Sequence, residues 1–167
     1  MDPHLERLRR EVEAVIAGLS KEGMLRHPPG KWCAAEILEH LYLTYTGTVK
    51  GFQRILEAGR PDAGKPTWKN RAQAWVVVGF GYMPVGRKAP ARSHPRGLPA
   101  EAVSENIGPE ISKMDDTITR CENQFGRSVK VLDHPILGPF TVLQWRKFHL
   151  IHGLHHLKQI RRLCERA

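Results

Sequence analysis

Long stretches of apolar residues at helical spacing constrain the fold of this chain more than any other feature. Apolar side chains recur every three or four residues from Leu5 to Leu19, as they do along one face of an α-helix. Asp2 and Pro3 have the character of an N-cap and a first-turn proline, so this spacing predicts a helix from about Pro3 to Ser20. No strand-like alternation is convincing, and we therefore expect an all-α protein.

Three further long helices are predicted in the rest of the chain. They are expected from Trp32 or Cys33 to Ala58, from Pro99 or Ala100 to Phe125, and from Thr141 to about Arg166. Gly108-Pro109 should kink or split the middle one, whereas Thr141 and Gln144 have the spacing of a capping box. Residues 128–140 are expected to form a loop. Helices of this length in 167 residues predict a single domain, residues 1–167, folded as a four-helix bundle.

A long insertion separates the second and third of these helices. Residues 60–99 are rich in proline, glycine and basic side chains, and they contain one short apolar piece. We interpret that piece, Trp68 to Phe80, as a short helix. A connection this long inside a small domain often serves as a functional flap.

The charge of the chain does not point to one kind of partner. The net charge is +9, but the basic residues are spread over the start, the middle and the end of the sequence. No helix-turn-helix pattern and no basic strand interleaved with aromatic residues accompanies them. We therefore interpret the charge as solvated surface, and binding to nucleic acid is not expected.

Membrane, secreted and disulfide-based classes are also disfavoured. The longest apolar stretch, Trp75 to Met83, is far shorter than the roughly 20 residues of a membrane helix. The N-terminus is charged from the start and lacks the apolar core of a signal peptide. The cysteines (Cys33, Cys121 and Cys164) lie far apart without a CxxC pair, which argues against a disulfide framework or a zinc ribbon. A cytoplasmic location is expected.

Histidines supply the strongest chemical signal. Four of the nine fall within the segment from His149 to His156. His152 and His156 are four residues apart, so on a helix their imidazoles share one face and can chelate one metal ion. Two ligands cannot complete its coordination shell, and His40 in the apolar second helix offers a third. Three histidines with an open fourth position are the ligand set of many catalytic metal sites.

Other interpretations of these residues remain open. A single histidine such as His40 is often a hydrogen-bonded core residue, and His149 and His155 are expected to be neighbours of the site rather than ligands. Glu36 and Gln159 lie near the ligands by helical count and would orient them from behind. Cys33 is expected to be a small buried residue.

Two stretches of the sequence resemble the DinB/YfiT-like superfamily. Gly30 to Trp32 and Ala35 to Leu41 look like the start of the second helix in those proteins. His134 to Thr141, with Trp145 and Phe148, and then His152 to Ile160 are similar to the signature of their last helix. The likeness extends from about residue 30 to residue 162, and the long basic insertion departs from the family pattern.

This resemblance implies a four-helix bundle with a divalent metal site, and it carries the ligand roles onto His40, His152 and His156. Members of the superfamily are described as metal-dependent enzymes. Some are S-transferases that use a low-molecular-weight thiol, others hydrolyse or isomerise, and many form homodimers. The native metal is left open among zinc, nickel, iron, manganese and copper.

Three functional hypotheses follow from these observations. The first is a divalent-metal-dependent enzyme, a thiol S-transferase or a hydrolase, that acts on a small molecule. The second is a non-catalytic metal-binding stress or ligand-binding protein, which a fourth protein ligand such as Cys33 would favour. The third is a nucleic-acid-associated protein, and only the positive charge suggests it.

Overall fold

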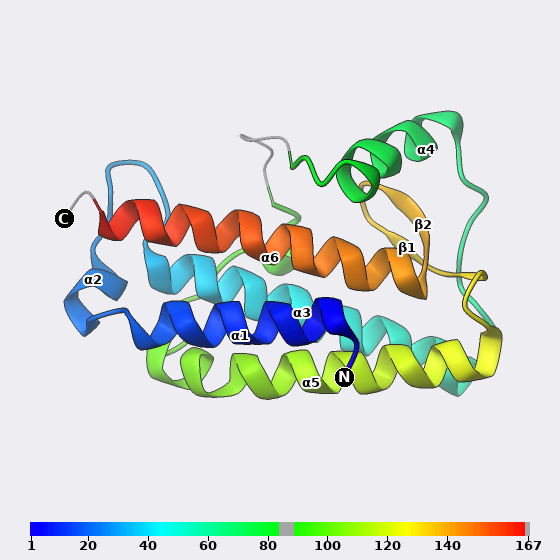
Figure 1. The fold of residues 1–167 in the computed structure, drawn as a ribbon, viewed down its shortest axis with the longest axis horizontal. Coiled ribbons are helices and arrows are strands. Elements are labelled where there is room, and N and C mark those ends of the chain that lie inside the picture. Colours follow the sequence, from blue (N-terminus) through cyan, green and yellow to red (C-terminus); the bar gives the residue numbers. More distant parts are fainter. Residues whose placement is uncertain (84–88, 166–167) are drawn as a thin grey trace.

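A computed structural model describes residues 1–83 and 89–165 of the chain. Its dominant feature is a set of long helices that run beside one another along the longest axis of the molecule (Figure 1). These are α1 (Pro3–Ala17), α3 (Ala34–Ala58), α5 (Ala100–Phe125) and α6 (Val142–Cys164). α1 packs against α5 and α6, and α3 packs against α5 and α6. The predicted mainly helical fold is confirmed.

The ends of these helices follow the local signals of the sequence. The Asp2 carboxylate accepts a hydrogen bond from the backbone N–H of His4 and caps α1. Thr141 and Gln144 form the predicted capping box at the start of α6. Gly59 ends α3 in the left-handed conformation with a φ of +66°, which glycine adopts without strain. The predicted end of the last helix at Arg166 lies outside the described residues.

The core lies between the apolar faces of the long helices. Its largest fully buried side chains include Tyr45 and Phe52 from α3, Leu5 and Leu8 from α1, and Met114 from α5. Arg146 of α6 is also buried, and its guanidinium group lies 3.5 Å from the Asp115 carboxylate. The packing of these faces brings the middle of α3 beside α6.

The structure adds two details to the predicted helices. α5 continues through Gly108-Pro109 without a split, and Pro109 lies at an exposed position of the helix. The connection between the first two predicted helices contains a further short helix, α2 (Lys21–Leu25). The Ser20 hydroxyl caps α2 by accepting a hydrogen bond from Gly23 N–H.

A β-hairpin replaces the loop that was expected before α6. β1 (Lys130–His134) and β2 (Gly138–Thr141) pair antiparallel, so the fold is not purely α-helical. The strands are too short for a clear alternation, but the hairpin buries Val131 and Phe140 against the helices. Close packing continues at Gly51 of α3, where a Cβ atom would lie 2.8 Å from Leu132.

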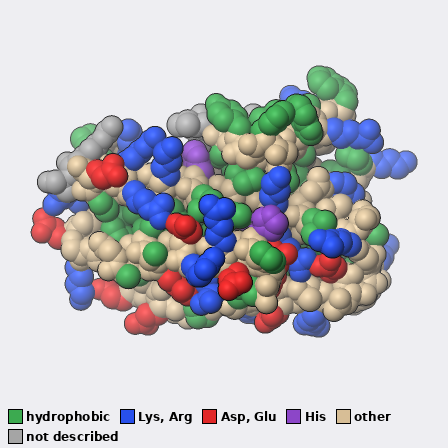
Figure 2. Space-filling view, viewed as in Figure 1, with side chains coloured by type: hydrophobic (Ala, Val, Ile, Leu, Met, Phe, Trp, Pro, Cys, Tyr) green, Lys and Arg blue, Asp and Glu red, His purple; other side chains and the backbone are tan. Residues whose placement is uncertain are grey.

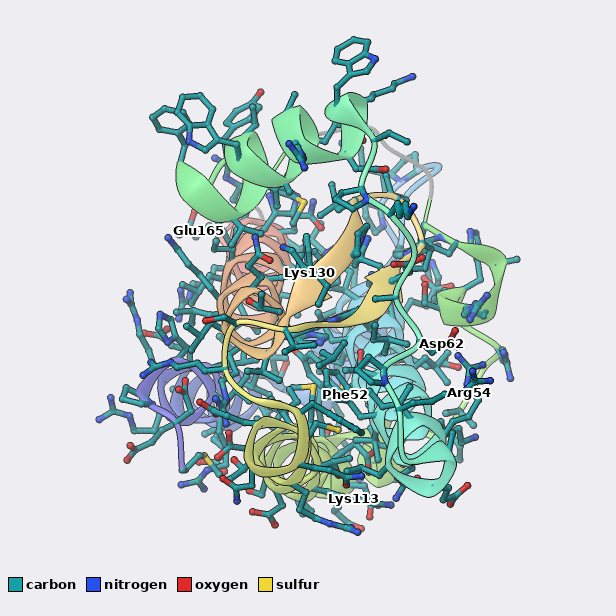
Figure 3. The ribbon with its side chains drawn as sticks, turned by 90° about the vertical axis from the view of Figure 1, so that its right-hand side faces the viewer. Phe52, Arg54, Asp62, Lys113, Lys130 and Glu165 are labelled. Atoms are coloured by element: carbon teal, nitrogen blue, oxygen red, sulfur yellow. The ribbon has the colours of Figure 1, made fainter. Side chains whose placement is uncertain are left out.

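The long insertion is partly helical. It holds α4 (Trp68–Ala74), which continues into a π-helical turn, η1 (Trp75–Gly79), and a 3₁₀ turn, η2 (Ala91–Ser93). The predicted short helix from Trp68 to Phe80 is thus confirmed. Figures 1 and 3 show α4 at the top of the molecule, above the hairpin and away from α5. η2 packs instead against α3.

No helix in the described ranges 1–83 and 89–165 combines the length and the apolar character needed to cross a membrane.

Candidate metal centre

The three histidines predicted as ligands meet between α3 and α6. One ligand nitrogen from each of His40, His152 and His156 lies within 4.8 Å of the others. The Nε2 atoms of His40 and His152 are 3.3 Å apart. The ring centroids of His40 and His156 are separated by 4.8 Å, and those of His152 and His156 by 4.6 Å. Residues that are 112 positions apart in the sequence thus form one group.

The separation of the His40 and His152 Nε2 atoms suits a metal ion. Imidazole nitrogens bound about 2.0–2.1 Å from a tetrahedral zinc ion lie roughly 3.3 Å from each other. The separation of the two Nε2 atoms has this value without any rearrangement. The donor set, three imidazoles without a carboxylate or a thiolate, therefore fits a divalent ion of the kind that prefers nitrogen ligands.

A backbone carbonyl fixes the orientation of His40. Its Nδ1 lies 2.8 Å from the carbonyl oxygen of Ser93, so Nδ1 carries the proton and donates it. Nε2 then presents its lone pair toward the other two rings. Such hydrogen bonds on the far nitrogen are the usual way in which proteins set the tautomer of a metal-binding histidine.

Glu39 holds the segment that provides this carbonyl group. Its buried carboxylate accepts hydrogen bonds from the backbone N–H groups of Arg96, at 2.6 Å, and Gly97, at 3.1 Å. Two adjacent residues of α3 thus bind the segment 93–97. His40 contacts the Ser93 carbonyl, and Glu39 contacts the N–H groups of Arg96 and Gly97. Glu39 was missed in the sequence, although a carboxylate inside an apolar helix was a usable signal.

Gln159 has the predicted supporting role for His156. The Gln159 side-chain oxygen lies 2.9 Å from Nδ1 of His156, which again leaves Nε2 free to bind an ion. The amide nitrogen of Gln159 contacts Nε2 of His155 at 3.0 Å. His155 is therefore a neighbour of the site, as predicted, and it stands behind Gln159.

The other predicted supporting residue, Glu36, does not act on the three histidines. Its carboxylate accepts a hydrogen bond from the backbone N–H of Cys33 and caps α3. Cys33 is buried, as predicted, and its sulfur groups with His27 and Glu36 instead of with the three histidines. Burial raises the pKa of the Cys33 thiol, which disfavours the thiolate that binds metals.

His152 has a different environment from the other two candidate ligands. Its ring stacks on Phe148, with an angle of 14° between the planes and 5.3 Å between the centroids. Its Nδ1 is buried and forms no hydrogen bond within the described residues. Packing against Phe148, rather than a polar partner, sets the orientation of this ring.

Electrostatics keep all three imidazoles neutral. Burial lowers the pKa of each, and for His152 the nearby His156 and His40 rings add to this effect. The pKa of His156 falls to about 3. A neutral imidazole has the lone pair that a metal ion needs, so the site is prepared for binding at neutral pH.

Two further histidines lie behind the site. His149 is completely buried, stacks on Trp145 and faces Tyr45, so it is a neighbour and not a member of the group. His134 of β1 packs on Phe148, with 4.5 Å between the ring centroids. Its Nδ1 accepts backbone hydrogen bonds within the hairpin turn. Both rings therefore surround the site without belonging to the ligand set.

A family model for proteins of unknown function, DUF1569, matches residues 2–163 of the chain. The chain belongs to the DUF1569 family. All three candidate ligands, together with Ser93, Glu39 and Gln159, lie inside the DUF1569 match. No curated protein and no solved structure matched the chain.

Proposed function

We propose that this DUF1569 protein is a divalent-metal-dependent enzyme with the four-helix-bundle architecture of the DinB/YfiT-like superfamily. The observation that carries the proposal is the convergence of His40, His152 and His156 within 4.8 Å. Two of the three rings have the far nitrogen engaged by a hydrogen bond acceptor. Site geometry of this kind is characteristic of metal ligands rather than of core histidines.

An open coordination position supports catalysis over a purely structural role. Among the described residues, no fourth ligand atom joins the three histidines, whereas structural zinc sites usually have four protein ligands. A divalent ion on neutral ligands lowers the pKa of a water or thiol bound at such a position. This chemistry suits S-transfer with a small thiol, or hydrolysis, and we propose these two reaction types.

The residues of the chain have distinct roles in the proposed site. Ser93 and Gln159 would hold the His40 and His156 rings in the metal-binding tautomer. Phe148 would keep water from one side of His152. The segment 93–97, bound to α3 through Glu39, would support His40 from the side of its Nδ1 atom. A homodimer and a cytoplasmic location remain part of the proposal.

Metal content tests this proposal directly. Protein purified without a histidine tag and incubated with zinc should contain one equivalent of zinc per chain, as measured by elemental mass spectrometry. His40→Ala, His152→Ala and His156→Ala should each lose it, because two imidazoles do not hold the ion firmly. His4→Ala is the control, since His4 belongs to neither group of side chains that could hold an ion. Full metal content in all three ligand variants would refute the proposal, as would loss in the control alone.

A further inference from the structure

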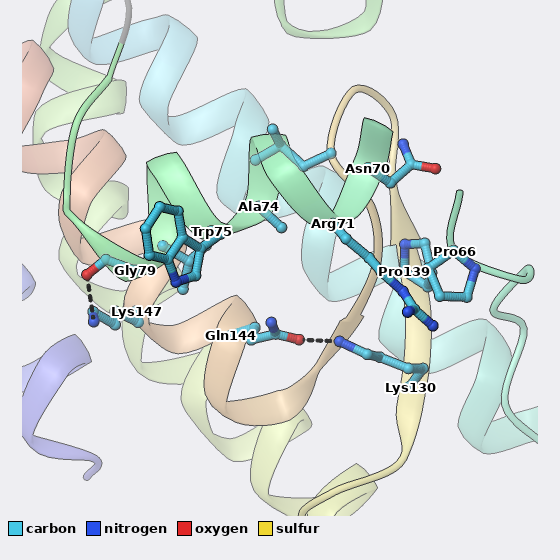
Figure 4. A pocket seen from close by; sticks show the side chains of 12 residues that line it. Pro66, Asn70, Arg71, Ala74, Trp75, Gly79, Lys130, Pro139, Gln144 and Lys147 are labelled. Atoms are coloured by element: carbon cyan, nitrogen blue, oxygen red, sulfur yellow. Dashed lines mark hydrogen bonds between the residues drawn. The ribbon is translucent and has the colours of Figure 1, made fainter. Parts of the chain in front are cut away.

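A pocket lies between α4 on one side and the β1–β2 hairpin with α6 on the other, outside the group of three histidines (Figure 4). Its volume is about 460 Å³, within the range of sites for small molecules. None of the three candidate metal ligands lines it. The pocket thus offers a binding site that the metal chemistry does not explain.

Three cations from three separate elements line this pocket. They are Arg71 of α4, Lys130 of β1 and Lys147 of α6, and no carboxylate is among the lining residues. Figure 4 shows the ammonium group of Lys130 at the Gln144 side chain and that of Lys147 at the Gly79 carbonyl. Within the described residues, none of the three forms an ion pair.

Arg71 and Lys130 carry like charges that repel each other in the free protein. Burial and the neighbouring Arg71 guanidinium lower the pKa of Lys130, which shows that the ammonium form is disfavoured there. The sequence supplies no acidic residue between Asp62 and Glu101 to offset this repulsion. An anion placed between the cations would relieve it and gain charge-assisted hydrogen bonds.

The remaining wall of the pocket is flat and apolar. Trp75 contributes its indole ring, which Phe80 supports from outside at 4.2 Å between ring centroids. Val78 and Leu137 contribute buried apolar side chains. A ligand with a planar apolar part can lie against this wall while its charged end faces the cations.

The close approach of α4 to the hairpin is built into the sequence. Gly138 has a φ of +75°, and a Cβ atom there would lie 2.7 Å from the Asn70 side chain. Thr67 and Asn70 form a capping box that fixes the first turn of α4. The pocket is therefore a defined feature of the fold, with both of its sides held in place.

We propose that this pocket binds a small organic anion, a carboxylate or a phosphate monoester carried on a planar aromatic group. The oxyanion contacts Arg71 and Lys130, and the aromatic group lies on Trp75. The amide of Asn70 or Gln144 supplies a further polar contact. This site is separate from the proposed metal centre, and its test does not depend on metal binding.

Calorimetric titration of the full-length protein tests the proposal with two soluble probes, phenyl phosphate and benzoate. Saturable binding of either supports it, and the tighter one identifies the type of oxyanion. Arg71→Gln and Lys130→Gln should each weaken binding about tenfold, the size expected for the loss of one charge-assisted hydrogen bond. Lys69→Gln removes the same charge from the same helix outside the pocket and should leave binding unchanged.

Several results would overturn this inference. Equal weakening by Lys69→Gln would show unspecific attraction to the basic surface, and equal binding of benzyl alcohol would show that the anion is not recognised. Figure 2 shows hydrophobic side chains gathered over α4 and η1, where Trp68 of α4 and Phe80 after η1 are exposed. Binding to vesicles of anionic lipid without binding of either probe would assign this face to a membrane surface instead. Circular dichroism of each variant verifies that the fold is intact.

Discussion

At the residue scale, the candidate metal centre depends on atoms that never touch the metal. The Ser93 carbonyl and the Gln159 amide oxygen each accept a hydrogen bond from the Nδ1–H group of a candidate ligand, which leaves Nε2 to face the centre of the group. His152 has no such partner and relies on Phe148. The three ligands are therefore held by three different means, and their sensitivity to mutation should differ.

Gln159→Leu tests the support of His156. The variant keeps the size of the side chain but removes the acceptor for Nδ1, so the ring is free to turn. We expect metal affinity to fall about 10- to 100-fold, the usual effect of losing such a partner, without loss of the fold. Competition with a chromogenic chelator measures this change. Gln124→Leu, at an exposed position of α5, should leave the affinity unchanged, and an equal loss there would contradict the assignment.

Residue-level prediction from the sequence had a clear limit. His40 lies on a different helix, so helical spacing alone does not place it beside the other two candidate ligands. The shared face of His152 and His156 was predictable, because helical spacing sets which side chains lie together. The role of Ser93 was not, because a backbone carbonyl carries no residue-type signal and its segment contacts α3 only through the tertiary fold. Glu36 was assigned to the wrong role for a related reason, since its helix begins beside it and takes its carboxylate as a cap.

At the scale of elements, a single glycine sets the distance between two helices. A Cβ atom at Gly153 of α6 would overlap Leu8 of α1 and lie 3.1 Å from the Tyr45 hydroxyl oxygen. Gly153 directly follows the ligand His152. The close packing of α1 on α6 thus takes place beside the candidate metal centre.

Gly153→Ala should therefore destabilise the protein by about 1–3 kcal/mol, the cost of overpacking a core. Gly47→Ala is the matched control, because Gly47 is an exposed helical position of α3 with nothing within 4 Å of an added Cβ atom. It should stabilise by about 0.5–1 kcal/mol through helix propensity. Urea denaturation measures both, and the same sign for both variants would contradict this account.

The elements differed in how well they could be predicted. The long helices have several turns of apolar periodicity, so their boundaries were nearly correct. The β1–β2 hairpin was missed because strands of this length give only two or three alternating positions, and Pro135 and Gly138 resemble a loop. The hairpin forms because Val131 and Phe140 find a core to enter, which is a property of the assembled helices.

At the scale of the whole molecule, buried neutral histidines make stability depend on pH. His149 is fully buried, and burial lowers its pKa to about 3; burial likewise lowers the pKa of His134 to about 4. Below the ordinary value of about 6.5, the unfolded chain takes up protons that the folded chain does not. The free energy of unfolding therefore falls as the pH falls from about 6.5 toward these lower values.

His149→Leu should weaken this dependence. The variant loses one proton-binding group of the unfolded state, so the slope of stability against pH below 6 should decrease by up to about 1.4 kcal/mol per pH unit. Denaturation with urea at pH 7.5 and at pH 5, with a chelator present, gives the two slopes. Gln124→Leu, at an exposed position of α5 without a titratable group, should leave the slope unchanged. A wild-type protein equally stable at both pH values would contradict the prediction.

The separation of the candidate ligands along the chain has a consequence for the stability of the folded state. An ion bound to His40 and His152 would tie together positions that are 112 residues apart. Joining such distant points restricts the unfolded chain far more than joining neighbours, because the entropy of closing a loop grows with its length. The proposed metal centre would then also serve as a cross-link between the two halves of the polypeptide.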